Sequence, residues 1–189
     1  LDAVRAKLDA GANEKGPAAF LKRKMVERLA RDLPKWADAA RRFGGIGIGV
    51  AGLKSLRTRS IVVSPNIPCL VNVDLGALVE AEVDLPVITE NDANAGAWGE
   101  LVAGAGRGIR HMAYITLGTG LGAGIILDGK LFRGISGFAG ELGHTVIEPD
   151  GRACACGGRG CLETVASATG IVKTATEKLK NVSGSLLLE

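Results

Sequence analysis

The stretch PVITENDANAGAWGEL, residues 86–101, decides the fold class of this chain. Its first four residues predict a strand, and residues 90–101 predict a helix that is entered through Asn91 and Asp92. Strands are also predicted at residues 46–50 and 60–63, and a helix capped by Asp74 is predicted to run to about residue 83. Strands that alternate with helices in this way indicate an α/β fold.

The two flanks of this region differ from it. Residues 1–43 are rich in Ala, Lys and Arg and predict helices over 17–31 and 35–42. Beyond residue 111 the pattern predicts strands and tight turns, namely strands at 112–117 and 124–127 and a turn at Asp128-Gly129. We therefore expect two lobes, residues 1–108 and residues 109–189, with the boundary near 104–111.

Composition favours a cytoplasmic globular protein. The chain has 189 residues, and its 23 basic and 20 acidic residues give a net charge of +3, too small to indicate nucleic-acid binding. The basic run at residues 22–24 is short and fits a solvated helix face. No segment resembles a transmembrane helix or a signal peptide, so no membrane partner is expected.

A candidate metal site lies in GHTVIEPDGRACACGGRGC, residues 143–161. One imidazole and three thiolates make a closed tetrahedral shell that suits a structural Zn²⁺. Clustered cysteines in a cytosolic chain favour a metal over a disulfide, although buried free thiols or a disulfide are the alternatives. The expected ligands are His144, Cys154, Cys156 and Cys161, whereas Cys69 stands alone and is expected in the core.

Polar residues follow the strand that begins at Pro86. Ligands of open α/β sheets bind beyond the carboxyl ends of strands, where the Asp92 carboxylate could accept a proton from a substrate hydroxyl. Asn91 could hydrogen-bond a neighbouring hydroxyl. The alternative is that either residue simply caps the following helix, which is a very common arrangement.

A glycine-rich turn, TLGTGLGAG, covers residues 116–124. Its bare backbone N–H groups could cradle phosphate oxygens, with a threonine hydroxyl as an additional donor. It is neither a Walker A motif nor a clear dinucleotide fingerprint, because no Lys-Ser/Thr pair and no helix follow it. A plain tight hairpin explains the same residues equally well.

The segment GFAGELGH, residues 137–144, adds polar side chains close to the metal ligands. Glu141 and His144 are three residues apart and share a face on a helical turn, and Glu163 follows Cys161 by two residues. Carboxylates and an imidazole around one ligand suit a polyhydroxylated molecule, because each hydroxyl both donates and accepts. Ordinary surface charge is the alternative for the two glutamates.

Together these motifs resemble the ROK family of bacterial sugar kinases and sugar-responsive repressors. The resemblance runs from about residue 45 to about residue 167, in the expected order. It implies the two-lobed actin-like ATPase fold, which is ribonuclease H-like, and ATP-dependent phosphorylation of a hexose. The motifs that carry it are SPNIP, ENDANA, GAGRG, YITLGTGLGAGI, GFAGELGH and CACGGRGCLE.

The resemblance also implies roles for individual residues. Asp92 would be the catalytic base, and Mg²⁺ would accompany ATP. The ATP phosphates would be touched by Gly118, Thr119 and Gly120. The sugar would be held by Gly52, Asn66, Asn91, Glu141, His144 and Glu163. His144 would link the sugar to the zinc, which it would bind together with Cys154, Cys156 and Cys161.

Two departures from the family pattern lead us to expect a fold that is incomplete at both ends. Residues 1–43 lack the D-x-G-G-T-K phosphate loop, and the chain stops at residue 189, before the adenosine-binding part. The alternatives to a kinase are the sugar-sensing module of a ROK repressor and a catalytically silent sugar-binding fragment. Residues 17–42 show no compact helix-turn-helix pattern, which favours the kinase. Glucose is the first candidate substrate, and family kinases are often homodimers.

Overall fold

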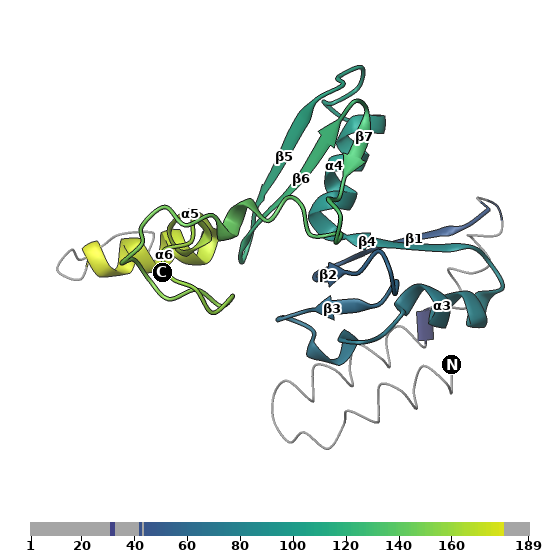
Figure 1. Cartoon of the computed structure of the whole chain (residues 1–189), viewed down its shortest axis with the longest axis horizontal. Coiled ribbons are helices and arrows are strands. Elements are labelled where there is room, and N and C mark those ends of the chain that lie inside the picture. The colour runs from purple at the N-terminus through teal and green to yellow at the C-terminus, as the bar shows by residue number, and fades with distance from the viewer. Residues whose placement is uncertain (1–30, 33–41, 43, 180–189) are drawn as a thin grey trace. The chain divides into compact units, whose positions relative to one another are not determined.

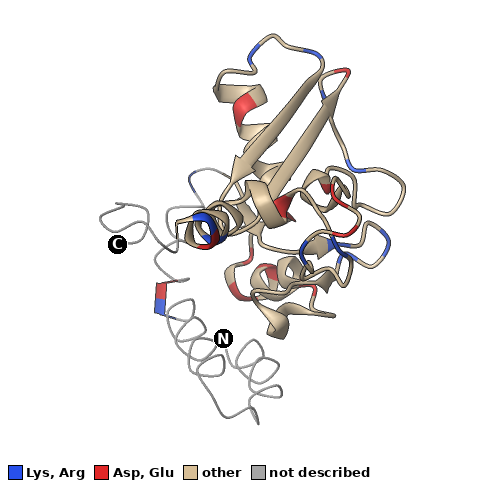
Figure 2. Ribbon diagram, turned by 90° about the vertical axis from the view of Figure 1, so that its left-hand side faces the viewer, with Lys and Arg blue, Asp and Glu red and all other residues tan. Residues whose placement is uncertain are grey.

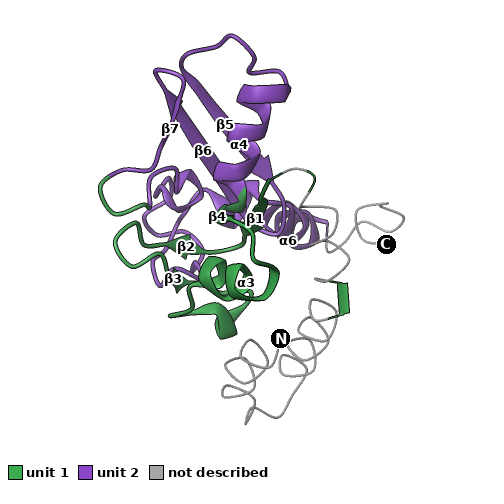
Figure 3. Cartoon of the chain, turned by 90° about the vertical axis from the view of Figure 1, so that its right-hand side faces the viewer, with its two compact units in different colours: residues 1–92, 135–137 green, residues 93–134, 138–189 purple. Residues whose placement is uncertain are grey.

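The computed structural model describes residues 31–32, 42 and 44–179 (Figure 1). The chain divides into two compact units, one within residues 1–92 and 135–137 and the other within 93–134 and 138–189 (Figure 3). Both units combine strands with helices, which confirms the α/β class. The helices predicted over residues 17–31 and 35–42 lie almost wholly outside the described residues.

The first unit is built on a parallel strand pair. Strand β1 (Ile46–Val50) pairs in parallel with β4 (Val87–Asn91), and helix α3 (Leu75–Val83) lies between them in the chain. This is a βαβ connection, which parallel strands require. Strands β2 (Leu53–Lys54) and β3 (Ile61–Val63) form a short antiparallel pair. After β3 and the loop at residues 64–67, the chain forms a 3₁₀ turn, η1 (Pro68–Leu70).

Local sequence explains why α3 forms where it does. The Asp74 carboxylate accepts a hydrogen bond of 3.0 Å from the backbone N–H of Ala77, which confirms the predicted N-cap. The helix ends at Asp84, which has a left-handed backbone with φ of 52°. Val79 and Val83 are buried against Val87 of β4, so the apolar face of the helix makes one core of this unit.

The second unit contains a three-stranded antiparallel sheet. Strands β5 (Met112–Leu117), β6 (Leu121–Leu127) and β7 (Lys130–Phe132) lie in the order β5-β6-β7. The last two are joined by the predicted turn, where Asp128 and Gly129 both have positive φ, 51° and 71°. Strand β6 begins three residues earlier than predicted, because Leu121 still pairs with Leu117 of β5.

Helix α4 (Asp92–Ala103) packs closely on this sheet. A Cβ atom added at Gly124 would lie 2.5 Å from the Cβ atom of Ala97, and one added at Gly122 would lie 3.0 Å from that of Ala93. Only glycines on β6 permit so close an approach. This packing groups α4 with the second sheet, and the first unit accordingly ends at Asp92 apart from residues 135–137. The lobes expected at residues 1–108 and 109–189 stay a prediction.

The last described segment carries the candidate metal ligands. It contains a 3₁₀ turn, η2 (Leu142–His144), a long loop, and the helices α5 (Glu163–Ala166) and α6 (Ala168–Lys178). Isolated bridges between Val146 and Cys161 and between Ala153 and Arg159 hold the loop together. In the described part of the chain, every helix is too short or too polar to cross a lipid bilayer.

Candidate functional site

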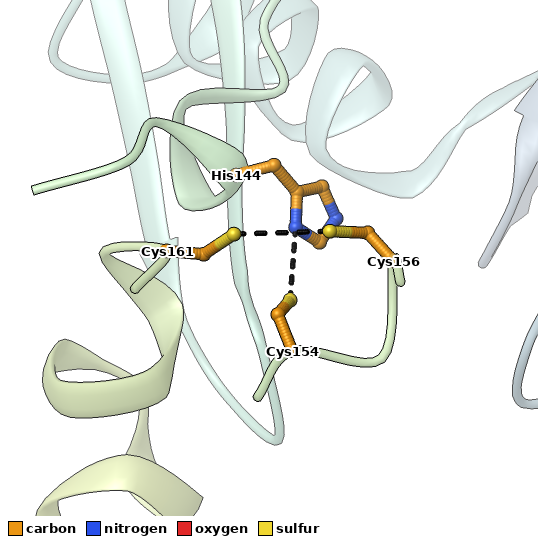
Figure 4. A group of neighbouring side chains, drawn as sticks. All are labelled: His144, Cys154, Cys156 and Cys161. Atoms are coloured by element: carbon orange, nitrogen blue, oxygen red, sulfur yellow. Dashed lines mark hydrogen bonds between the residues drawn. The ribbon is translucent and has the colours of Figure 1, made fainter. Parts of the chain in front are cut away.

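The four predicted metal ligands come together in the second unit. One ligand atom from each of the four residues lies within 4.8 Å of the others (Figure 4). The histidine comes from the end of η2, two cysteines come from the following loop, and the third lies two residues before the start of α5. The four are His144, Cys154, Cys156 and Cys161.

The spacing of these atoms fits a tetrahedral ion. Bonds of about 2.3 Å to sulfur and about 2.0 Å to nitrogen place neighbouring ligands roughly 3.5–3.8 Å apart. The Sγ atoms of Cys156 and Cys161 lie 3.7 Å apart, and the Nδ1 atom of His144 lies 3.5 Å from the Sγ atom of Cys154. The cysteines are not paired as disulfides. The donor set and its geometry therefore fit a metal centre.

Glycines and backbone hydrogen bonds shape the loop between the cysteines. Gly157 and Gly160 have positive φ, 91° and 69°, which L side chains rarely adopt. The backbone N–H of Cys154 donates to the carbonyl of Gly158 at 2.9 Å, and the N–H of Gly157 donates back to Cys154 at 3.1 Å. This tight turn directs both loop sulfurs toward the same point.

The protein environment shifts the pKa values of the thiols in opposite directions. Burial is the main cause that raises the pKa of Cys154 to about 12, and burial also raises the pKa of Cys161, whose exposed fraction is 1%. Cys156 is exposed, and a hydrogen bond with the backbone of Gly158 lowers the pKa of its thiol. Two of the three sulfurs therefore hold their protons at neutral pH until a cation displaces them.

Two carboxylates flank the imidazole, as expected for a polar ligand site. The Oε1 atom of Glu163 lies 3.5 Å from Nδ1 of His144 and accepts a hydrogen bond of 3.0 Å from the Cys154 thiol. The Oε2 atom of Glu141 lies 3.7 Å from Nε2 on the other side of the ring. Glu163 is the less exposed of the two, at 19% against 39%. Each ring nitrogen thus lies near a carboxylate, and Nδ1 also lies near the sulfur of Cys154.

The glycine-rich turn joins β5 to β6 in the same unit. Gly118 and Thr119 are exposed, and the carbonyl of Gly118 accepts a hydrogen bond of 2.9 Å from the backbone N–H of Ala168 at the start of α6. A Cβ atom added at Gly120 would lie 2.9 Å from Oε2 of Glu163. The turn therefore lies directly beside one of the two carboxylates.

The remaining candidates belong to the first unit. Asn91 ends β4 and Asp92 opens α4, so the helix starts two residues later than predicted. The Nδ2 atom of Asn91 donates to the carbonyl of Gly52 at 3.2 Å and to the Asp92 carboxylate at 3.1 Å. Asn66 is exposed in the loop after β3. Asn91, Asp92 and Gly52 are thus brought together, with a carboxylate at a helix N-terminus, where the helix dipole favours its charge.

The sequence analysis did not single out Arg152, which lies two residues before Cys154. Its guanidinium contacts α5 and α6 from the loop that carries the metal ligands. No pattern in the sequence could reveal this, because a single arginine in a polar loop has no periodicity and no motif partner.

The chain is similar to known proteins over most of its length. The family model described as "ROK family" matches residues 4–189. The chain is 42% identical to the glucokinase of Halalkalibacterium halodurans over 166 residues, which cover 87% of this chain and 50% of that protein. It is 39% identical to the xylose repressor of Caldicellulosiruptor bescii over 160 residues, 85% of this chain and 40% of that protein.

Solved structures agree with the sequence comparisons. The crystal structure of a ROK family glucokinase from Streptomyces griseus, in complex with glucose and AMPPNP, matches with a TM-score of 0.67 and 45% identity. The match covers 73% of this chain and 44% of that one. The chain thus spans half or less of the length of these three proteins. The likeness confirms the actin-like ATPase fold, and the chain belongs to the ROK family.

Proposed function

We propose that this protein is an ATP-dependent sugar kinase that phosphorylates a hexose, with glucose as the first candidate. The observation that carries this proposal is the gathering of Glu141, His144 and Glu163 at the metal cluster. Two carboxylates and a ring nitrogen can bind the donors and acceptors of neighbouring sugar hydroxyls. Relatives named glucokinase support the same activity.

The metal centre is proposed to hold a structural Zn²⁺. Three thiolates and one imidazole would close its coordination shell and leave no open position for a substrate. His144 would then bind the ion through Nδ1, which lies at the sulfurs, and would present Nε2 to the sugar. The ion would thus orient a sugar-binding side chain without taking part in the chemistry.

Asp92 is proposed as the catalytic base. Its carboxylate would accept the proton from the sugar hydroxyl as the hydroxyl oxygen attacks the γ-phosphorus of ATP in line. Asn91, which donates to the same carboxylate, would hold it in position. Gly52, Asn66 and Asn91 are proposed to complete the contacts with the sugar.

The ATP phosphates are proposed to lie against the turn formed by Gly118, Thr119 and Gly120. Backbone N–H groups of Thr119 and Gly120 and the Thr119 hydroxyl would bind their oxygens, since the N–H of Gly118 already donates to the carbonyl of Gly120 at 2.9 Å. Mg²⁺ would arrive with ATP and offset the negative charge of the phosphates. We further propose that the protein acts in the cytoplasm, and that a homodimer is its assembled state.

An ATP-coupled assay against a panel of hexoses tests the activity. The full chain should phosphorylate glucose, and Asp92→Asn should lower kcat by roughly 10²- to 10⁴-fold, the usual contribution of a general base, while calorimetry shows glucose still bound. An Asp92→Asn variant with the parental kcat would show that Asp92 is not the catalytic base. A parent protein that phosphorylates no hexose would refute the kinase.

A sugar-sensing repressor is the second candidate, because relatives named xylose repressor match at similar identity. Basic and acidic residues are both spread along the described part of the ribbon (Figure 2). A gel shift on promoter DNA that responds to sugar would support the repressor. Sugar binding with neither activity would leave a catalytically silent module.

A further inference from the structure

Arg152 connects the metal-binding loop with both helices that follow it. Its side chain is largely covered, with 20% exposed. One guanidinium nitrogen donates to the carbonyls of Thr164 and Gly170, at 2.9 and 3.3 Å, and to the hydroxyl of Thr174 at 2.9 Å. Another forms an ion pair of 2.5 Å with Glu177.

One residue that Arg152 holds, Thr164, lies next to the proposed sugar-binding residue Glu163 and contacts the proposed metal ligand Cys161. Thr164 follows Glu163 in the chain, and its hydroxyl donates to the carbonyl of Cys161 at 2.7 Å. The backbone of Arg152 also takes part, since its carbonyl accepts a hydrogen bond of 2.8 Å from the N–H of Gly160. Arg152 therefore touches the chain on each side of the last cysteine.

Only arginine can make this set of bonds. A guanidinium presents five N–H donors in a fixed plane, whereas a lysine ammonium has three donors on a single atom. Helix α5 has four residues, and although Ser167 donates to the carbonyl of Glu163, so short a helix cannot supply partners for all its carbonyls. Arg152 supplies a donor to one of them and pairs its charge with Glu177 on α6.

We propose that Arg152 is a positioning residue that locks the metal-binding loop onto α5, so that the metal ligands and the Glu163 carboxylate are set by one rigid unit. The expected effect of Arg152 on zinc affinity rests on the contacts of the metal-binding loop alone. Its expected effect on glucose affinity rests on the function proposed above.

The test measures metal and sugar affinity separately on the full chain. Zinc affinity is obtained by competition with a chromophoric chelator, and glucose affinity by calorimetry on zinc-loaded protein. The variants are Arg152→Ala, Arg152→Lys and, as a matched control, Arg159→Ala, which removes an exposed arginine from the same loop.

Arg152→Ala should weaken zinc binding by about 10- to 100-fold, the range found when groups that support metal ligands are removed. It should also raise the glucose Kd and the KM for glucose about tenfold and change kcat much less. Arg152→Lys should bind zinc and glucose more tightly than Arg152→Ala but less tightly than the parent, because lysine keeps the charge and lacks the planar set of N–H donors. Arg159→Ala should match the parent in both.

A purely stabilising role gives a different outcome. If Arg152→Ala lowers Tm but binds zinc and glucose as the parent does, the proposal is wrong. If that variant does not fold, Arg152→Lys decides the matter, and parental affinities in it would overturn the proposal. If the parent binds no glucose, glucose is not the sugar, while the zinc titration still tests whether Arg152 fixes the metal-binding loop on α5.

Discussion

The Oε1 atom of Glu163 lies 3.0 Å from the Sγ atom of Cys154, so a proposed sugar ligand touches a proposed metal ligand. The thiol keeps its proton and donates it in a hydrogen bond to the carboxylate. Loss of that proton would place two negative charges in contact, which is unfavourable unless a cation lies between or beside them. If Glu163 binds the sugar and Cys154 the metal, as proposed, this contact would make the two affinities depend on each other.

The first prediction concerns the metal ligands. Cys161→Ser should lose most of its bound zinc, because a serine hydroxyl is a poor replacement for a thiolate in a closed shell. Cys69→Ser is the matched control, since Cys69 packs against the core of the first unit and should keep the parental zinc content. Elemental analysis of purified protein should find about one zinc per chain in the parent and the control. Equal zinc in all three proteins would refute the site.

The second prediction is a pH dependence of zinc affinity. Burial raises the pKa values of Cys154 and Cys161, so both are protonated at neutral pH without metal and must release protons when zinc binds. Each released proton makes the affinity rise about tenfold per pH unit, so these two thiols alone give about 100-fold, and any proton released by Cys156 adds to that slope. Chelator competition at pH 6.5 and 7.5, corrected for protonation of the chelator, measures this slope. A flat profile would show that the buried sulfurs do not bind the ion.

The third prediction tests the contact between the glycine turn and the sugar site. Gly120→Ala would place a methyl group 2.9 Å from Oε2 of Glu163 and should displace that flexible carboxylate. Loss of a hydrogen bond to a charged group predicts glucose binding about tenfold weaker, measured by calorimetry without ATP. Gly118→Ala is the control, because its Cβ atom would meet open space. If the Gly120→Ala and Gly118→Ala variants bind glucose with equal affinity, Glu163 does not bind the sugar.

The fourth prediction concerns stability. Gly124→Ala should destabilise the protein by about 1–3 kcal/mol, since its methyl group would overlap Ala97 in the interface between α4 and β6. Gly99→Ala, on the exposed side of α4, should instead stabilise it by about 0.5–1 kcal/mol through the higher helix propensity of alanine. Urea unfolding gives both values. A neutral result at Gly124 would argue against the close packing of α4 on β6.

Features that depend on neighbouring residues could be predicted from the sequence. The Asp74 cap, the Asp128-Gly129 turn and the cluster of three cysteines with His144 all follow from short-range patterns, and the structure has them. The cap and the turn depend on residues that are neighbours in the chain. The metal cluster is recognised because closely spaced cysteines near a histidine are typical of metal sites.

Features that depend on residues far apart in the chain could not be predicted from the sequence. Glu90 and Asn91 extend β4 rather than opening α4, because they pair with Gly49 and Val50 of β1. Arg152 finds its partners 12 to 25 residues further along the chain. These contacts exist only in the folded protein, so no local pattern marks them.

The most direct test of the account is a calorimetric glucose titration of the full chain, first loaded with zinc and then depleted by a chelator, with folding checked by circular dichroism. One metal ion is proposed to orient the side chains that bind the sugar. Glucose binding should therefore be at least about tenfold weaker in the depleted protein and should recover when zinc is restored. The same glucose Kd with and without zinc, in protein that stays folded, would contradict it.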